Sequence, residues 1–217
     1  MSKETIAIVF GGRSSEHEIS CLSAGGVLSA IDRNKYDVVL IGITKDGNWV
    51  LVPETHQLSI KDGKLPEAPS SAPGVVADVA GFSVDGKPLK VDLIFPTLHG
   101  PYGEDGSIQG FFEIADLPYV GSGVLASAVA MDKSFAKPIF AAHGLKVAEC
   151  FIVTATQWSS DKAALQKKAD ALGYPLFVKP ARGGSSRGTT KVKSADQFAN
   201  AIAEAHRFDP KAMVESA

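Results

Sequence analysis

One stretch of the sequence has the residue types of a phosphate-binding site. Residues 175–190, PLFVKPARGGSSRGTT, place Lys179 at the end of a short apolar run and follow it with a loop rich in glycine and hydroxyl residues. Glycines let a backbone approach a ligand closely, so that consecutive N–H groups can turn toward one anion. A lysine ammonium and serine hydroxyls add a point charge and further donors. The predicted phosphate-binding residues are Lys179, Gly183, Gly184, Ser185 and Ser186.

The same loop does not form a Walker motif. The spacing from Gly183 to Gly188 matches the start of that motif, but Thr189 stands where a lysine is required. The alternative to a phosphate cover is a mobile surface loop between two strands, which Gly/Ser clusters often indicate. Lys179, carried on the preceding strand, favours the phosphate hypothesis.

A second candidate site lies near the N-terminus. Residues 5–10 form an apolar run typical of a buried strand, two glycines follow, and Ser15 and Glu18 have the spacing of a helix capping box. The free N–H groups of such a helix would face the crevice at the end of the strand, where anionic ligands bind. Glu16 either stabilises the helix dipole or holds a substrate ammonium. The segment lacks GxGxxG spacing, so we expect no dinucleotide site.

A third candidate follows the strand expected over 91–95. His99 opens a polar, glycine-containing loop at the end of this strand, where α/β folds keep their sites. His99 is either structural or part of a site, and Glu104 and Asp105 either cap the next helix or face a ligand. That helix should be amphipathic, carrying Ile108, Phe111, Phe112 and Ile114.

The remaining elements alternate strands and helices. A strand over 36–43 should complete a βαβ unit, Asp-Gly pairs predict three hairpin turns between 44 and 90, and glycines at 121–123 indicate a domain junction. Lys133, read alone, is a solvated helix residue. After it we expect a helix to about 143, a strand at 149–154, a helix at 160–172, a strand at 191–193, a helix capped by Ser194 and Gln197, and a strand that only begins at 213.

Composition excludes several classes of function. The chain has 217 residues and a net charge of −2, so it offers neither a basic surface for nucleic acid nor a polybasic membrane patch. Its two cysteines, Cys21 and Cys150, lack metal-ligand spacing. No signal peptide or membrane span is indicated. We therefore expect a cytoplasmic protein with small-molecule partners.

With these residues identified, the sequence resembles the D-alanine–D-alanine ligases of the ATP-grasp superfamily. The resemblance rests on IVFGGRSSEHEIS at 8–20, HGPYGEDGSIQG at 99–110, PYVGSGVLASAVAMDK at 118–133 and FVKPARGGSSRGTTKV at 177–192. It implies an α/β fold, with an N-terminal doubly wound parallel-sheet domain over 1–121 and a central ATP-grasp α+β subdomain over 122–214. Residues 215–217 should begin the last ATP-grasp subdomain, which we expect to lie outside this chain.

The resemblance also implies roles on the substrate side. Glu16 matches the family position that holds the amino group of the first D-alanine, and His99 matches a position close to that substrate's carboxylate. Ser185 matches a residue that links to Glu16 and fixes the substrate site. The expected catalytic residues are Glu16, His99 and Ser185.

On the nucleotide side, Lys133 and Lys179 match two lysines that contact ATP phosphates, and Glu215 matches an acidic residue that contacts the adenosine part. Arg187 departs from the small apolar residue that relatives commonly carry; it either contacts phosphate or extends into solvent. The expected ATP-binding residues are Lys133, Lys179, Gly183, Gly184, Ser185, Ser186 and Glu215.

The implied reaction is the ATP-dependent ligation of two D-alanines through an acyl phosphate, for peptidoglycan synthesis. Because two anions must meet, lysines, N–H donors and magnesium offset their repulsion, and a closing glycine-rich loop excludes water. The family's magnesium ligands belong to the C-terminal part, so no metal ligand is assigned here and the chain alone is expected to be inactive.

Expected partners are D-alanine, ATP and a second copy of the N-terminal domain, with no nucleic acid or membrane. Two alternatives remain open. One is another ATP-grasp carboxylate–amine ligase, such as a D-alanine–D-lactate ligase. The other is an inactive fragment that binds a ligand or dimerises.

Overall fold

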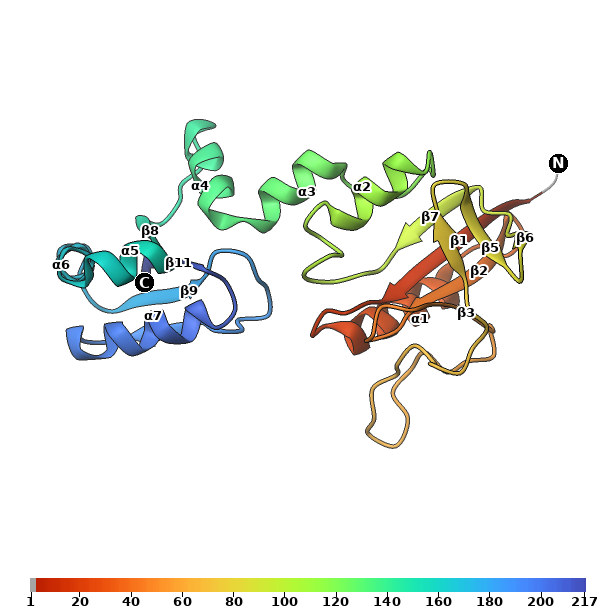
Figure 1. Ribbon diagram of the computed structural model, residues 1–217, viewed down its shortest axis with the longest axis horizontal. Helices are drawn as coiled ribbons and strands as arrows, with labels where there is room; N and C mark the ends of the chain where they lie inside the picture. The colour runs from red at the N-terminus through yellow and green to blue at the C-terminus, as the bar shows by residue number, and fades with distance from the viewer. Residues whose placement is uncertain (1–2) are drawn as a thin grey trace. The chain divides into compact units, whose positions relative to one another are not determined.

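The computed structural model describes residues 3–217, which form two compact units (Figure 1). The first unit ends at Ala128 and the second is Val129–Ala217. The domain limits proposed from the sequence, 1–121, 122–214 and 215–217, stay a prediction. No helix within residues 3–217 is long and apolar enough to cross a membrane.

The first unit is built on a four-stranded sheet. Its strand order is β3-β2-β1-β7, in which β1 runs parallel to both β2 and β7 and β3 is antiparallel to β2. A separate three-stranded sheet contains β4, β5 and β6. The elements are β1 (Glu4–Gly11), α1 (His17–Ala30), β2 (Tyr36–Ile43), β3 (Trp49–Val52), β4 (Val76–Asp78), β5 (Gly81–Val84), β6 (Lys87–Pro88), β7 (Leu93–Pro96), α2 (Ser107–Ile114) and α3 (Val124–Met131), which extends into the second unit.

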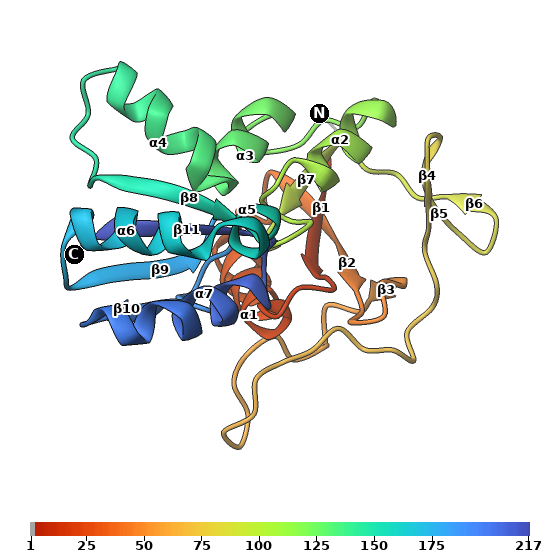
Figure 2. The same ribbon diagram turned by 60° about the vertical axis from the view of Figure 1, so that its left-hand side comes forward.

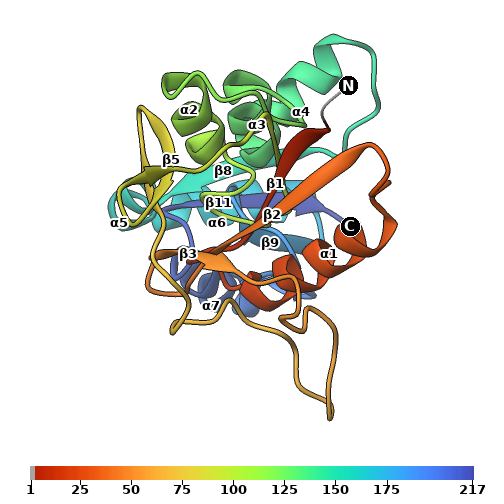
Figure 3. The ribbon, with the colours of Figure 1, turned by 90° about the vertical axis from the view of Figure 1, so that its right-hand side faces the viewer.

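Both faces of this main sheet are covered, which explains why β1 is a continuous apolar run. Successive side chains of a strand point to opposite faces. Ile8 and Phe10 pack with α1, whereas Ala7 and Val9 pack in the cluster that contains Phe112 of α2. Figure 3 shows α1 and α2 on different sides of β1. The predicted doubly wound α/β fold is confirmed.

The segment between β2 and β7 contains the expected hairpin turns. Gly47 follows β2 with positive φ, Asp62 and Gly63 lie inside a bridge between Lys61 and Lys64, and a third Asp-Gly pair joins β5 to β6. In the next helix Phe112 is fully buried, whereas Ile114 is exposed. Its position at the C-terminal end of the short helix α2 directs it away from the sheet.

The predicted capping box of the first helix is wrong. α1 begins at His17, and Glu16 rather than Ser15 occupies the N-cap position. The N–H of Glu16 donates to Ser14 Oγ at 2.9 Å, so Ser14 supplies the acceptor at this turn. The carboxylate of Glu18 pairs with Lys45 instead of turning back to the helix start.

The second unit is a four-stranded antiparallel sheet of order β10-β9-β11-β8 (Figure 2). β11, expected to begin at residue 213, is a six-residue strand between β9 and β8, because pairing extends back to Lys211 and Ala212. The elements are α4 (Lys133–Ala142), β8 (Cys150–Thr154), α5 (Ala155–Ser160), α6 (Lys162–Leu172), β9 (Leu176–Pro180), β10 (Thr190–Val192), the 3-10 helix η1 (Ala195–Gln197), α7 (Phe198–His206) and β11 (Lys211–Ser216).

Two helix starts in this unit differ from expectation. The helix predicted over 160–172 is α6, which Asp161 caps through the N–H of Ala164, but the helix before it, α5, was not predicted and starts at a capping box formed by Thr154 and Gln157. Ser194 makes no side-chain cap, and Gln197 instead accepts from the N–H of Lys193 at 2.9 Å. Local hydrogen bonds therefore decide both boundaries.

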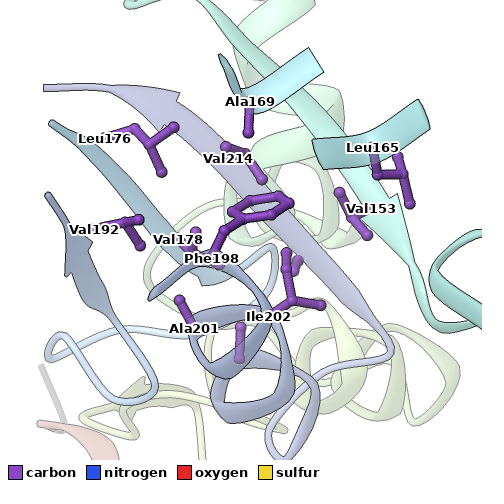
Figure 4. Packing of buried hydrophobic residues seen from close by; sticks show 12 residues of the cluster. Val153, Leu165, Ala169, Leu176, Val178, Val192, Phe198, Ala201, Ile202 and Val214 are labelled. Atoms are coloured by element: carbon purple, nitrogen blue, oxygen red, sulfur yellow. The ribbon is translucent and has the colours of Figure 1, made fainter. Parts of the chain in front are cut away.

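The core of the second unit lies between its sheet and helices α6 and α7 (Figure 4). Phe198 is fully buried at its centre and packs edge-to-face on Trp158, with ring centroids 5.8 Å apart. From the sheet it meets alternate residues of β9 and β11, among them Val178 and Val214. The opposite faces of β9 and β11 do not belong to this core, and the candidate site lies on them.

Replacing Phe198 with alanine should lower the free energy of unfolding by about 3–5 kcal/mol, because it leaves a cavity in this core. The measurement is urea unfolding followed by Trp158 fluorescence in a Trp49→Phe background, which removes the other tryptophan. Phe140→Ala is the matched control. Phe140 is exposed, so its loss should cost no more than about 0.5 kcal/mol. Equal effects of the two substitutions would contradict the assignment of the core.

Candidate functional site

Strand pleating directs Lys179 to the side opposite the core. In β9, Leu176 and Val178 are fully buried in the core, whereas Phe177 and Lys179 point to the other face. β9 pairs with β11 so that Lys179 lies opposite Met213 and Phe177 opposite Glu215. Diagonal cross-strand neighbours on one face lie within reach of long side chains. The register therefore brings Lys179 to Glu215.

The carboxylate of Glu215 is shared by two lysines. Its Oε2 accepts from Lys179 Nζ, and its Oε1 accepts from Lys137 Nζ of α4. Lys137 also donates to the backbone oxygen of Ala148 at 2.8 Å. Burial alone would raise the pKa of Glu215, but the hydrogen bonds from Lys137 and Lys179 outweigh it and hold that pKa below its ordinary value. Glu215 is therefore an ionised anchor between two cations.

Lys133 holds the start of the glycine-rich loop. The backbone N–H of Lys133 donates to Ala181 O at 3.0 Å, and its Nζ donates to Gly183 O at 2.7 Å. Asp132 caps α4 by accepting from the N–H of Ser134, which fixes where this lysine begins the helix. Burial, and then the charge of Lys179, lower the pKa of Lys133. An anion placed between the two lysines would relieve their repulsion.

The loop itself has a backbone suited to ligand binding. Ser185 and Ser186 both have positive φ, at 50° and 57°, which is uncommon for residues other than glycine. Such conformations are concentrated at ligand-binding segments, where the surrounding structure supports their cost. Both residues line the same cavity as Lys133 and Lys179.

Both ends of the loop are anchored. Asp209, whose side chain is fully buried, accepts from the N–H of Arg182 at 2.8 Å and from its guanidinium at 3.0 and 2.9 Å. At the far end, a methyl group on Gly188 would lie 2.5 Å from the ring of Phe208, so any larger residue would have to displace this ring. The guanidinium of Arg187 lies over that ring, 5.3 Å from its centroid. Arg187 thus stacks on Phe208 and also lines the cavity.

These elements enclose a cavity of about 490 Å³ in the second unit. All of the predicted ATP-binding residues contribute to it, and positive groups predominate among its described lining. The lining residues that carry charge on their side chains are Lys133, Lys179, Arg187 and Glu215. A cavity with this charge and a cover of backbone N–H and hydroxyl groups suits a polyphosphate.

The carboxylates near this cavity are already engaged by cations. Glu215 pairs with Lys137 and Lys179, and Asp132 and Asp209 pair with Lys211 and an arginine. Within residues 3–217 no cluster of three or more His, Cys, Asp or Glu side chains could hold a metal ion. The residues present do not fit a magnesium site of their own.

In the first unit, the predicted substrate residues meet at Gly100. A methyl group on Gly100 would lie 2.6 Å from Glu16 Oε2, so the carboxylate rests directly against this glycine. The N–H of Gly100 donates to Glu104 Oε2 at 2.6 Å, which holds the loop after β7. Gly100 has a φ of +71°, which an L side chain rarely adopts. The start of α1 and the loop after β7 are thereby brought into contact.

His99 borders a separate cavity of about 260 Å³ in this unit. Its Nε2 lies 2.8 Å from Ser23 Oγ of α1. The cavity includes the glycine turn after β1 and apolar side chains such as Trp49 and Leu98. Glu16 and His99 thus lie in the first unit and Ser185 in the second, and the expected link from Ser185 to Glu16 stays a prediction.

Sequence reasoning missed several residues that shape these sites. Lys137 lies four residues after Lys133 and therefore on the same helix face, a spacing that could have indicated it. His17 is buried, accepts from the N–H of Ala68 at Nε2, and so donates from Nδ1 to Gly12 O at 2.8 Å. Asp209 gave no signal in the sequence, because its partner Arg182 becomes a neighbour only through the pairing of β9 and β11.

The fold matches that of solved ligases. The structure of VanG, a D-Ala:D-Ser ligase from Enterococcus faecalis, superposes with a TM-score of 0.85 at 37% identity, covering 100% of this chain and 63% of that one. The D-alanine-D-alanine ligase from Coxiella burnetii gives 0.86 at 33% identity, covering 99% and 64%. These similarities define the class of fold.

The family follows from sequence comparison. A family model described as D-ala D-ala ligase N-terminus matches residues 5–122, and one described as D-ala D-ala ligase C-terminus matches 139–217. The chain therefore belongs to the D-alanine–D-alanine ligase family. A D-alanine–D-alanine ligase of Arthrobacter sp. (strain FB24) is 50% identical over 226 residues, covering 99% of this chain and 59% of the relative. The chain thus spans about three fifths of the length of such relatives.

Gly100→Ala should destabilise the first unit by more than Gly86→Ala. Both glycines have similar positive φ, +71° and +73°, but a methyl group on Gly86 meets nothing within 4 Å. Gly86→Ala should therefore cost only the left-handed backbone, about 1–2 kcal/mol. Gly100→Ala adds the clash with Glu16, and a Glu16→Ala substitution in that background should relieve it. Urea unfolding gives the free energy of unfolding of the unsubstituted chain, the two glycine variants and the double variant. Equal losses for Gly86→Ala and Gly100→Ala would be inconsistent with the contact between Gly100 and Glu16.

Affinity for inorganic tripolyphosphate should fall as pH rises through the lowered pKa of Lys133. Phosphate binding requires the ammonium form, which is present below that pKa and lost above it, and the pKa lies below the ordinary 10.5. Lys133→Arg should retain affinity at higher pH, because a guanidinium stays protonated. Calorimetric titration across the alkaline range checks this, with Lys146→Arg as the exposed control. An unchanged profile in Lys133→Arg would show that another group titrates.

Proposed function

We propose that this chain supplies the nucleotide site and the first-substrate site of an ATP-dependent D-alanine–D-alanine ligase. The observation that carries the proposal is the cavity of the second unit, where Lys133 and Lys179 face a glycine-rich loop on a strand pair shared with Glu215. Membership in the D-alanine–D-alanine ligase family supports the choice of substrate.

In the proposed reaction, a carboxylate oxygen of the first D-alanine attacks the γ-phosphorus of ATP, and ADP leaves. The amine of the second D-alanine then attacks the acyl carbon, loses a proton and expels phosphate. Lys133 and Lys179 would bind the phosphates and offset the repulsion between the two anions. The loop with Gly183, Gly184 and Ser186 would cover them and exclude water.

On the substrate side, Glu16 would hold the ammonium of the first D-alanine, and His99 would lie near its carboxylate. Their positions at the start of α1 and in the loop after β7 support this assignment. Ser185 would link the loop to Glu16, and Glu215 would contact the adenosine part. Magnesium would neutralise phosphate charge when bound; because the nearby carboxylates are already paired, no step is assigned to a metal held by this chain.

The proposed ligase would act in the cytoplasm, in the synthesis of peptidoglycan that determines cell shape. It would be a homodimer that associates through the N-terminal domain. A second candidate differs only in the amine or hydroxyl that attacks the acyl phosphate. VanG, a D-Ala:D-Ser ligase, is similar over the whole of this chain, so the residues described here do not distinguish second substrates. D-lactate is a further candidate of the same kind.

The proposed activity predicts D-alanine-dependent release of ADP and phosphate from ATP by the protein purified from its native source. A panel of D-alanine, D-serine and D-lactate as second substrate identifies the nucleophile. Lys133→Met and Lys179→Met should each lower kcat/KM roughly 100-fold or more, whereas Lys146→Met should not. Formation of AMP and pyrophosphate would overturn the assignment.

Binding is tested separately on the 217-residue chain, by titration with ATP in the presence and absence of magnesium. Because this chain offers no metal-ligand cluster among its described residues, the affinity should respond little to magnesium. No ATP binding under either condition would contradict a nucleotide site in the second unit.

A further inference from the structure

If the cavity binds a polyphosphate, Lys179 has two possible partners, Glu215 and a phosphate group. Its Nζ donates to Glu215 Oε2, yet the same ammonium is the one expected to reach phosphate oxygens. A lysine that turns to a phosphate leaves the carboxylate behind. Glu215 is largely buried, and an unpaired buried carboxylate is costly. Binding of a polyphosphate therefore requires a second cation for Glu215.

Lys137 has the geometry of that second cation. Its Nζ donates to the other carboxylate oxygen, Glu215 Oε1, and to Ala148 O at 2.8 Å. The side chain of Lys137 is only 12% exposed, half the value of Lys179 at 24%. Lys137 does not line the cavity, whereas Lys179 and Glu215 do. Lys137 is thus placed behind the carboxylate and held by the backbone.

We propose that Lys137 is a positioning residue that keeps Glu215 ionised and in place while Lys179 exchanges the carboxylate for a phosphate. The inference rests on the proposed function, because it takes the cavity to be the nucleotide site. Lys137 acts through Glu215 and touches neither phosphate nor adenosine. In the empty cavity Lys179 and Lys137 share the carboxylate, and in the occupied cavity Lys137 keeps it alone.

The alternative for Lys137 is a purely structural role in packing α4 against the sheet. Ala136 is the buried residue of α4, and Lys137 adds hydrogen bonds to Ala148 and β11. If the role of Lys137 were only structural, its substitution would affect folding and binding whichever residue occupies position 215. The proposed role depends on a carboxylate at 215, and this difference decides the experiment.

The test is a double-mutant cycle of Lys137→Met and Glu215→Gln, read as the affinity of the 217-residue chain for inorganic tripolyphosphate. This probe lacks adenosine, so it reports how freely Lys179 reaches phosphate. Lys137→Met alone should weaken binding roughly tenfold or more, because Lys179 must then leave an unpaired carboxylate. In the Glu215→Gln background, Lys137→Met should change affinity by less than about twofold, because residue 215 then carries no charge that needs a cation. Titrations at roughly 0.15 M salt limit the long-range effect of removing a charge.

Two further variants complete the design. Lys137→Arg should bind tripolyphosphate within about threefold of the unsubstituted chain, because it keeps the cation. Lys146→Met, which removes an exposed lysine of the same unit, should leave affinity unchanged. Thermal melts by circular dichroism show whether each variant is folded, and Lys137→Arg tests the proposal if Lys137→Met is not.

The outcomes separate this inference from the proposed function. Equal losses from Lys137→Met in both backgrounds, or weak binding by a folded Lys137→Arg, would overturn the role of Lys137. An unsubstituted chain that binds neither tripolyphosphate nor ATP would overturn the nucleotide site itself. A chain that binds both, with Lys137→Met equal to the unsubstituted chain, would leave the proposed function standing and overturn only the positioning role.

Discussion

The pairing of β9 with β11 is the constraint on which the second unit depends. Its register sets Val178 opposite Val214 on the core face, and Lys179 beside Glu215 on the other. One set of backbone hydrogen bonds thereby aligns a hydrophobic core with a charged site. A shift of one residue in β9 would exchange its two faces, turning Lys179 into the core and Val178 out of it. The core thus protects the geometry of the site.

Burial and neighbouring charges together set the pKa values of the ionisable groups in this site. Lys133 has a lowered pKa because burial and the charge of Lys179 disfavour its ammonium form, whereas Glu215 stays ionised because two lysines donate to it. The site therefore holds cations at some cost before any ligand is present. An anion that arrives between Lys133 and Lys179 recovers part of that cost, which is an expected property of a preorganised polyphosphate site.

The glycine-rich loop combines firm ends with a strained centre. Asp209 and Phe208 fix its two ends through Arg182 and Gly188, and Lys133 holds the carbonyl of Gly183. Between these anchors Ser185 and Ser186 keep positive φ. This combination places the tip of the loop along the cavity while its two ends stay anchored.

The sequence by itself determined the elements and the chemical character of the sites. Continuous apolar strands indicated a sheet covered on both faces, and the lysine before a glycine-rich loop indicated an anion, because these depend on neighbours along the chain. Tertiary structure decided the rest. It paired β11 with both β8 and β9 from Lys211 onward, and it brought Lys137 to Glu215 and Asp209 to Arg182. These facts depend on strand register and on partners far away in the sequence, which local patterns do not encode.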